Sequence, residues 1–234
     1  MLISVVIGAL NEEKYIGRTI KTVNAQKTVH DFEVIVGDGF SSDRTVEIAE
    51  KMGAKVVLEK NRSAAWERQA GYKVARGHIV AFTDADAELP EDWLQKILEE
   101  FAKDDKTVMV YGPVYFSDAG PFQKLLSELL MPLFMAFMAL LGMHNPIGSN
   151  IAVKRELFEQ AGGFDTGLVT CEDLDLAKRM KRLGKVRFSL RAGLYVSARR
   201  VKKWGYLYFL FFHLVNGLRF QFTGKANRKY DVVR

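Results

Sequence analysis

Residues 79–86 read IVAFTDAD, an apolar run that ends in two carboxylates. A continuous apolar run of this length is typical of a strand that is buried on both faces of a parallel sheet. Similar runs lie at 2–7, 32–36 and 55–58, and a further one at 108–111. Amphipathic stretches separate them. This alternation predicts an α/β fold with a mostly parallel central sheet flanked by helices.

Helices are predicted where apolar residues recur at i, i+4 and i+7 or i+8. In the first half they start near Ile16, Ser42, Ser63 and Pro90, and Ser and Pro are favoured at helix starts. The second half is less regular. We predict a loop over 145–152 and a helix that begins at Glu172-Asp173, where acidic side chains suit the helix dipole.

Composition and charge suggest a globular domain followed by a basic tail. The 234 residues are 48% hydrophobic and 26% charged, which excludes a disordered chain. The net charge is +6, and residues 199–234 hold nine Lys/Arg against one acid, Asp231. We therefore divide the chain into a domain over 1–198 and a tail over 199–234. A basic tail points to an anionic partner: phosphates, nucleic acid or an acidic membrane surface.

Two apolar segments stand out from this pattern. An insertion over about 121–144 contains 15 uncharged residues at 129–143, and the tail contains another 15 at 204–218. Both fall short of the roughly 20 apolar residues that a membrane span requires. They favour helices lying in an anionic membrane interface, with packing into the core or a dimer contact as the alternative. The first seven residues read as a strand and the single Cys171 suits a reducing compartment. We therefore expect a cytoplasmic protein, peripheral on the inner face of the cell membrane.

Acidic residues recur where predicted strands end. They occur in the segments 8–13, 37–43 and 84–86. Ligands of open α/β sheets bind at these carboxyl ends. Asp84 and Asp86 are placed to share Mg²⁺ or Mn²⁺, whose remaining positions a diphosphate can fill, although many such pairs are solvated loop acids.

Glu172 and Asp173 form a second acidic pair. Either residue is a candidate general base, and the alternative is an ordinary acidic first turn of a helix.

Five blocks together resemble a known family. They are residues 4–13 (SVVIGALNEE), 34–45 (VIVGDGFSSDRT), 68–77 (RQAGYKVARG), 82–86 (FTDAD) and 162–176 (GGFDTGLVTCEDLDL). In this order, over roughly 2–190, the chain resembles the family 2 inverting glycosyltransferases of the GT-A fold.

The resemblance implies a role for each matching position. In the nucleotide-sugar site it places Leu10 and Glu12 near the base and ribose, Asp38 on the base, Arg68 near the phosphates and Asp84 near the ribose and metal. Asp86 is implied as the main metal ligand. Asp173 is implied as the catalytic base, with Glu172 as its neighbour or substitute. Gly8 and Gly37 stand where the family usually has Pro and Asp, so the choice between UDP and GDP stays open.

Arg199 and Arg200 follow the predicted domain. An arginine pair can clamp a diphosphate as a lid, and it can equally be a basic cluster next to a membrane.

The expected activity is therefore metal-dependent, inverting transfer of a hexose from UDP- or GDP-sugar, with Mn²⁺ or Mg²⁺ as cofactor. The expected acceptor is a hydroxyl or phosphate, lipid-linked or polyprenyl phosphate. Alternatives are a nucleotidyltransferase and a non-catalytic membrane-associated scaffold. The former usually has a Gly-rich loop with a Lys near the first strand, whereas residues 8–13 are acidic. No GxGxxG follows the first strand and no nucleic-acid motif is found, which disfavours a dinucleotide oxidoreductase and a nucleic-acid partner.

Overall fold

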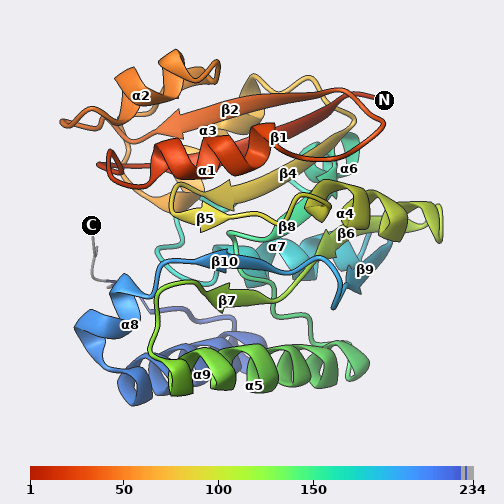
Figure 1. Cartoon of the computed structure of the whole chain (residues 1–234). Coiled ribbons are helices and arrows are strands. Elements are labelled where there is room, and N and C mark those ends of the chain that lie inside the picture. The colour runs from red at the N-terminus through yellow and green to blue at the C-terminus, as the bar shows by residue number, and fades with distance from the viewer. Residues whose placement is uncertain (228–229, 231–234) are drawn as a thin grey trace.

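The computed structural model describes residues 1–227 and residue 230. Within these residues a seven-stranded sheet has the order β3-β2-β1-β4-β8-β6-β9 (Figure 1). Its strands are β1 (Ile3–Ala9), β2 (Phe32–Asp38), β3 (Lys55–Leu58), β4 (Ile79–Asp84), β6 (Thr107–Tyr111), β8 (Ile151–Lys154) and β9 (Lys185–Phe188). The five apolar runs predicted as strands are all strands, and the α/β class is confirmed.

The sheet is parallel except at β8. Strands β3, β2, β1 and β4 pair in parallel, and β6 pairs in parallel with β9. Strand β8 lies antiparallel between β4 and β6. The predicted loop over 145–152 is therefore wrong at its end, because Ile151 and Ala152 are fully buried ladder residues of β8.

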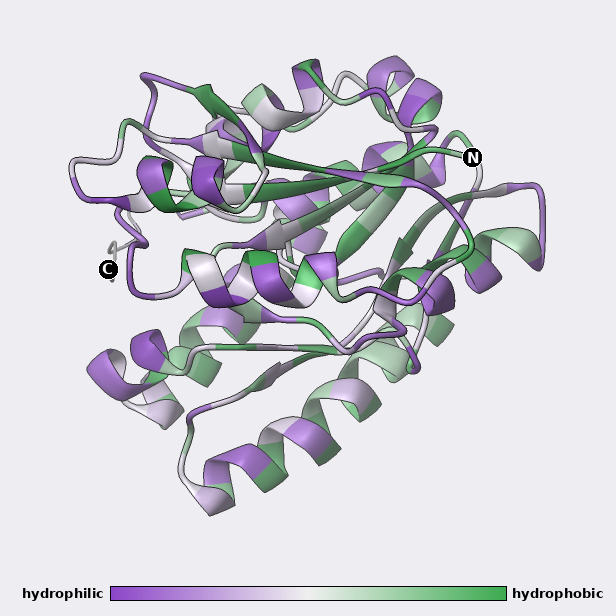
Figure 2. Ribbon diagram, turned by 45° about the horizontal axis from the view of Figure 1, so that its top comes forward, coloured by the Kyte–Doolittle hydropathy of each residue, from purple (hydrophilic) through white to green (hydrophobic). Residues whose placement is uncertain are grey.

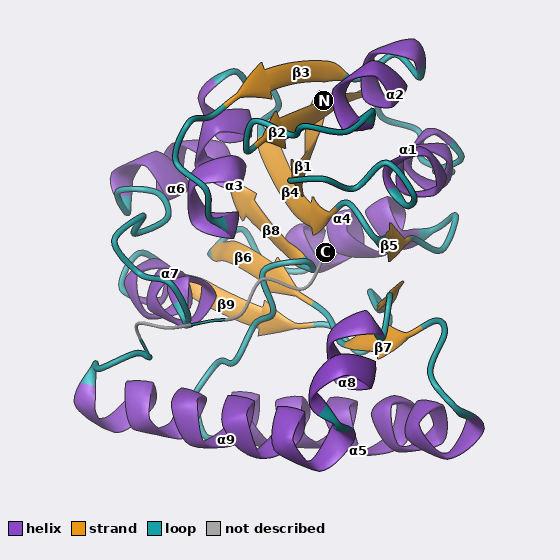
Figure 3. Ribbon diagram, turned by 90° about the vertical axis from the view of Figure 1, so that its left-hand side faces the viewer, coloured by secondary structure: helices purple, strands orange, loops and turns teal. Residues whose placement is uncertain are grey.

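Helices lie on both faces of this sheet and along one side of the molecule (Figures 1 and 3). They are α1 (Ile16–Asn24), α2 (Thr45–Lys51), α3 (Ala64–Lys73), α4 (Trp93–Ala102), α5 (Pro121–Leu140), α6 (Arg155–Gln160), α7 (Glu172–Lys181), α8 (Arg199–Trp204) and α9 (Tyr206–Thr223). The Ser63 hydroxyl caps α3, whereas α4 begins three residues after Pro90.

The period-2 alternation of buried strands divides the core into two layers. Val5 and Ile7 of β1 pack with α1, α2 and α4, while Val6 between them packs with α3, α6 and α7. Figure 2 shows the central strands as a hydrophobic layer enclosed by helices of mixed hydropathy.

A second, three-stranded sheet was not predicted. It has the order β5-β10-β7, formed by β5 (Ala87–Glu88), β10 (Leu194–Val196) and β7 (Val114–Phe116). Figures 1 and 3 place it between the main sheet and the side of the molecule that holds α5 and α9. Strands of two or three residues carry too little periodicity to be recognised from sequence.

Helices α5 and α9 lie along the same side of the molecule in both views (Figures 1 and 3). Both expose large apolar side chains, with Phe122 and Leu140 of α5 70% and 87% exposed and Leu207 and Phe222 of α9 80% and 76%. Helix α5 has 20 residues, longer than the uncharged stretch in the sequence, and is long and apolar enough by length and composition to cross a membrane. Only 22% of it is buried in the protein.

Candidate active site

The carboxyl ends of β1, β2 and β4 meet at one edge of the main sheet. In the register, Gly8 of β1 lies opposite both Gly37 of β2 and Asp84 of β4. The loops that follow these strands therefore start side by side. Leu10 and Glu12 lie in the first loop, Asp38 ends β2, and Asp86 follows Asp84 within two residues.

Arg68 of α3 joins two of the acidic groups. Its Nη2 lies 2.6 Å from Asp84 Oδ1 and its Nη1 lies 3.0 Å from Glu172 Oε1. The Arg68 side chain is only 4% exposed and that of Glu172 13%, whereas Asp84 is open to solvent. Burial opposes the charge of Arg68, but Asp84 and Glu172 outweigh it, and the pKa of the guanidinium is raised. Arg68 thus brings the start of α7 next to the end of β4.

Asp173, next to Glu172, is partly buried beside this cluster. Its Oδ2 accepts a hydrogen bond of 2.9 Å from the backbone N–H of Gly148, and its Oδ1 accepts one from Leu174 N–H. Burial, reinforced by the charge of Glu172, raises the pKa of Asp173 to about 7, against the opposing effect of Arg68. A carboxylate with a pKa near the working pH is suited to accepting and releasing a proton.

Gly148 is a site residue that the sequence analysis did not single out. A Cβ added there would lie 2.4 Å from Arg68 Nη1, so only glycine allows the guanidinium this close. The same residue donates to Asp173. Its presence in the predicted 145–152 loop was the available signal, but nothing local distinguishes it from an ordinary loop glycine.

Arg199 forms a second charged cluster with residues at the other end of the chain. Its Nη1 and Nη2 lie 2.6 and 2.7 Å from the two carboxylate oxygens of Glu12, and Nη2 lies 3.1 Å from Asp86 Oδ2. Its guanidinium carbon lies 5.0 Å from the centre of the Tyr15 ring. The bidentate geometry fits the planar fork of arginine. The contact of Arg199 with Glu12 places the start of α8 beside the loop after β1.

The donor set at Asp84 and Asp86 fits a divalent cation completed by a diphosphate. Both groups are hard oxygen ligands, and the Asp84 side chain is 38% exposed. Burial, reinforced by the charges of Asp84 and Glu12, raises the pKa of Asp86 to about 7 and outweighs the opposing effect of Arg199. Among residues 1–227 and 230, no group of three or more His, Cys, Asp or Glu is placed to hold a metal alone. A cation here would therefore take part of its coordination from a bound ligand.

The loops after β1 and β2 are held by their own hydrogen bonds. Leu10 is buried, and so is Asp38, whose two oxygens accept from the N–H of Ser41 at 2.7 Å and its hydroxyl at 2.5 Å. Two of these loop residues, Asn11 and Phe40, have φ of +56° and +61°. Asp38 thus orders the loop from within, and a contact of its carboxylate with a base remains a prediction.

Backbone strain marks the start of α7 as well. Cys171, directly before Glu172, has φ of +63° in the left-handed region. Such conformations are uncommon outside glycine and concentrate at functional sites. The turn delivers Glu172 and Asp173 to the cluster from the first turn of the helix.

Arg200 has a different partner from Arg199, and the clamping of a diphosphate by the two arginines stays a prediction. Its Nη1 donates to the Tyr230 hydroxyl at 2.6 Å, and its guanidinium carbon lies 4.4 Å from the centre of that ring. The two arginines point to different partners because they are neighbours on helix α8.

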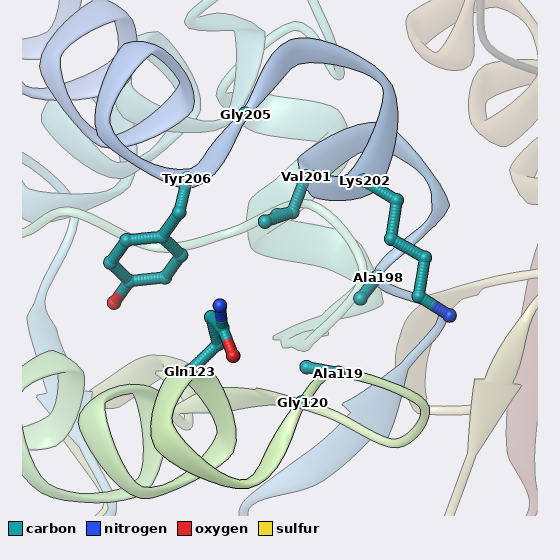
Figure 4. A pocket seen from close by; sticks show the side chains of 8 residues that line it. All are labelled: Ala119, Gly120, Gln123, Ala198, Val201, Lys202, Gly205 and Tyr206. Carbon is teal, nitrogen blue, oxygen red and sulfur yellow. The ribbon is translucent and has the colours of Figure 1, made fainter.

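A hollow of about 250 Å³ lies outside this cluster, between the start of α5 and the junction of α8 and α9 (Figure 4). Its lining is Ala119, Gly120, Gln123, Ala198, Val201, Lys202, Gly205 and Tyr206. Ala198, which lines it, directly precedes Arg199.

Known proteins share this architecture. A mannosyltransferase from Pyrobaculum calidifontis, solved with GDP-Man and Mn²⁺, superposes with a TM-score of 0.69 at 21% identity, over 96% of this chain and 65% of that one. Glucosyl-3-phosphoglycerate synthase from Mycobacterium tuberculosis, solved with Mn²⁺, UDP and its product, gives a TM-score of 0.65 at 22% identity, over 99% and 83%. At these identities the likeness establishes the GT-A fold.

Sequence relatives point to the same family. The glucosyl-dolichyl phosphate glucuronosyltransferase of Haloferax volcanii is 30% identical over 179 residues, which are 71% of this chain and 56% of that protein. The chain therefore spans little more than half of that relative. Residues 4–162, which carry β1, β4 and the loops of the carboxylate cluster, match the family described as Glycosyl transferase family 2. The chain belongs to the family 2 glycosyltransferases.

Proposed function

We propose that the protein transfers a sugar from a UDP- or GDP-sugar, with inversion, to a hydroxyl of a lipid-linked acceptor. The observation that carries this proposal is the placement of Asp173. It is a partly buried carboxylate with a pKa near 7, and its neighbour Glu172 is bridged by Arg68 to Asp84 at the end of β4. A base is required for a hydroxyl acceptor, whereas a phosphate acceptor is already ionised at neutral pH.

Each side chain has a part in the proposed reaction. Asp173 takes the proton of the acceptor hydroxyl as its oxygen bonds to the anomeric carbon, and the bond from that carbon to the diphosphate breaks. Arg68 keeps a fixed positive charge beside Asp84, where the diphosphate would lie. Asp84 and Asp86 would hold Mn²⁺ or Mg²⁺, which supplies positive charge to the departing diphosphate.

Arg199 has a conditional part in this scheme. It now neutralises Asp86 and Glu12. With a cation on Asp86, its guanidinium becomes available to a phosphate, for which its fork is suited. In this proposal Arg200 becomes a second, more distant phosphate ligand only when its hydrogen bond to the Tyr230 hydroxyl is broken.

The lipid-linked acceptor and membrane location rest on the outer surface. Helices α5 and α9 expose long apolar side chains, and Lys202 and Lys203 are exposed beside them. Such a surface suits insertion into an anionic leaflet. The Haloferax relative is named for a dolichyl phosphate substrate. We infer a peripheral protein on the cytoplasmic face, with α8 and α9 forming most of the tail proposed over 199–234, whose final residues lie outside the described part.

The test is the Asp173→Asn variant. We expect donor binding to be unchanged, measured as a thermal shift with UDP- and GDP-sugars in Mn²⁺. Transfer to a lipid-linked sugar hydroxyl should fall on the order of 10²–10⁴-fold, the usual contribution of a general base. Full activity on the hydroxyl acceptor would remove Asp173 from the reaction. Activity of this variant on polyprenyl phosphate alone would assign a phosphate acceptor instead.

Metal dependence is tested on Asp86→Ala. We expect Mn²⁺-dependent stabilisation by one nucleotide diphosphate in the unaltered protein, and its loss in the variant. Equal stabilisation with EDTA would contradict the proposed metal site.

A further inference from the structure

The last turn of α9 contacts both segments that hold Asp173. Lys178 of α7 donates from Nζ to the carbonyl oxygens of Phe220 and Gln221, each at 3.0 Å. Gln221 Nε2 in turn donates to His144 O and Asn145 Oδ1, each at 3.1 Å. Helix α9 therefore links the helix that carries Asp173 to the loop 141–150 between α5 and β8.

That loop reaches Asp173 between two anchor points. Gly148 N–H donates to Asp173 Oδ2 at 2.9 Å. Two residues later, Asn150 is fully buried and its side chain bonds Trp93 Nε1, Pro113 O and Ala192 O at 2.8–3.0 Å. On the other side, Gln221 holds His144 and Asn145. The position of the Gly148 amide is thus set by the core at one end and by α9 at the other.

Helix α9 also contacts the two residues that precede Glu172 and Asp173 in the chain. Asn216 is 3% exposed, and its Nδ2 donates to Thr170 Oγ1 at 3.1 Å and contacts Cys171 Sγ at 3.2 Å. These residues directly precede Glu172. Helix α9 therefore contacts both the residues that lead into Glu172 and Asp173 and the loop that donates a hydrogen bond to Asp173.

We propose that Gln221 is a positioning residue for Asp173. It acts through the main chain of residues 144–148, which fixes the direction of the Gly148 N–H. The proposal rests on the proposed function, in which Asp173 is the base. A hydrogen bond to a carboxylate weakens steeply as its angle is lost, so a shift of the loop changes both the orientation and the proton affinity of Asp173.

The test is Gln221→Met, which keeps side-chain length and removes both donated hydrogen bonds. We expect kcat to fall on the order of 10-fold, less than the 10²-fold cost of a 1 Å misplacement, with an unchanged KM for the donor sugar. The acidic limb of the pH profile should move to higher pH, because the Gly148 bond favours the ionised carboxylate. The charged and titratable groups that act on Asp173 are unaltered: Glu172 of its own helix, the Cys171 thiol before that helix, Arg68 of α3 and Tyr230.

A second variant and a control separate positioning from folding. Gln221→Glu keeps a polar, partly exposed side chain, but its carboxylate oxygens can only accept hydrogen bonds and would face His144 O and Asn145 Oδ1, which are acceptors too. We expect kcat to fall at least as far as in Gln221→Met. Thr223→Val removes two local hydrogen bonds near the end of the same helix, from Thr223 Oγ1 to Arg219 O and from Lys225 N–H to Thr223 Oγ1, and should leave kcat and the pH profile unchanged.

Wild-type kcat and acidic limb in Gln221→Met would overturn the proposal. A lower kcat with the acidic limb of the pH profile at its wild-type position would also overturn the proposal. The substitution would then have loosened the structure without changing the proton affinity of Asp173. Failure of the proposed function is read separately, from full hydroxyl transfer by Asp173→Asn.

Discussion

The ionisation of Asp173 depends on a balance among a few neighbours. Burial and Glu172 raise its pKa, while Arg68 and the backbone N–H groups of Gly148 and Leu174 lower it. The result, about 7, is more than two units above the ordinary value of an aspartate. Because a base must be unprotonated to act, transfer to a hydroxyl is expected to rise with pH through about 7 and level off above it.

This balance predicts a shift when Glu172 is neutralised. In Glu172→Gln the negative neighbour is lost, so the pKa of Asp173 falls and the acidic limb of kcat/KM moves to lower pH. The measurement is the pH dependence of transfer in the variant and the unaltered protein. A limb that stays in place would assign the titration to another group.

Gly148 predicts a steric effect. In Gly148→Ala the new Cβ meets the Arg68 guanidinium at 2.4 Å. Since Arg68 is held by Asp84 and Glu172, we expect a loss of stability of about 1–3 kcal/mol, typical of overpacking, and a reduced kcat.

The control for this substitution is Gly217→Ala in α9. There the added Cβ lies 3.8 Å from Leu174, an ordinary contact, and removing a helical glycine should stabilise by about 0.5–1 kcal/mol. Urea unfolding of both variants is the measurement, and equal effects would argue against the Arg68 clash.

At the scale of elements, α5 and α9 differ from the helices that cover the main sheet. Helix α1 buries Ile16, Ile20 and Val23 and turns polar side chains outward. Helices α5 and α9 instead keep leucine and phenylalanine side chains exposed. An apolar surface of this kind marks a membrane or protein contact, and the charge of the nearby lysines favours an anionic membrane.

The membrane assignment predicts the behaviour of a double variant. Leu133 and Phe137 are one turn apart on α5 and are 60% and 58% exposed. Changing both to Asp should reduce flotation with anionic liposomes several-fold while leaving the melting temperature nearly unchanged, because neither side chain is in the core.

The matched control is the same chemical change elsewhere. Val29→Asp with Leu58→Asp also replaces two exposed aliphatic residues, away from α5 and α9, and should float as the unaltered protein does. Absence of the unaltered protein from the floated fraction would rule out the proposed membrane contact.

At the scale of the whole molecule, Arg199 joins the two ends of the chain. Its contact with Glu12 spans 187 positions, and Glu12 is 2% exposed. Removing the arginine takes away the bidentate ion pair of a buried carboxylate. Breaking such a pair costs about 3–5 kcal/mol, whereas an exposed pair contributes under about 1 kcal/mol.

We therefore expect Arg199→Met to lower the free energy of unfolding by about 3 kcal/mol. The comparison is Arg191→Met, which removes the solvent-exposed pair of Arg191 with Glu99 and should change stability by less than about 0.5 kcal/mol. Urea denaturation measures the free energy of unfolding of both variants. An equally small change in the two would show that the contact of Arg199 with Glu12 does not stabilise the fold.

The amino-acid sequence by itself determined five of the seven strands of the main sheet and the residues at the ends of three of them. Apolar runs such as 79–83 and helical spacing such as Ile16, Ile20 and Val23 are local signals, and they survive in the structure as β4 and α1. Because parallel strands end at the same edge of a sheet, the sequence also placed Asp38 and Asp84 at one edge, where β2 and β4 end on either side of β1. The ligands of Asp38, Asp84 and Asp86 stay predictions, and so does the division of the chain into a domain over 1–198 and a tail over 199–234.

Only the tertiary structure decided which partners these residues have. Several contacts join segments that lie far apart along the chain. They are the pairing of β8 in the main sheet, the small sheet, the contact of Gly148 with Arg68 and Asp173, and the hydrogen bonds of Gln221 to the loop before β8. The different partners of Arg199 and Arg200 are set by such contacts as well. No local period encodes such contacts. They depend on which surfaces meet when burial of the two core layers brings the chain together.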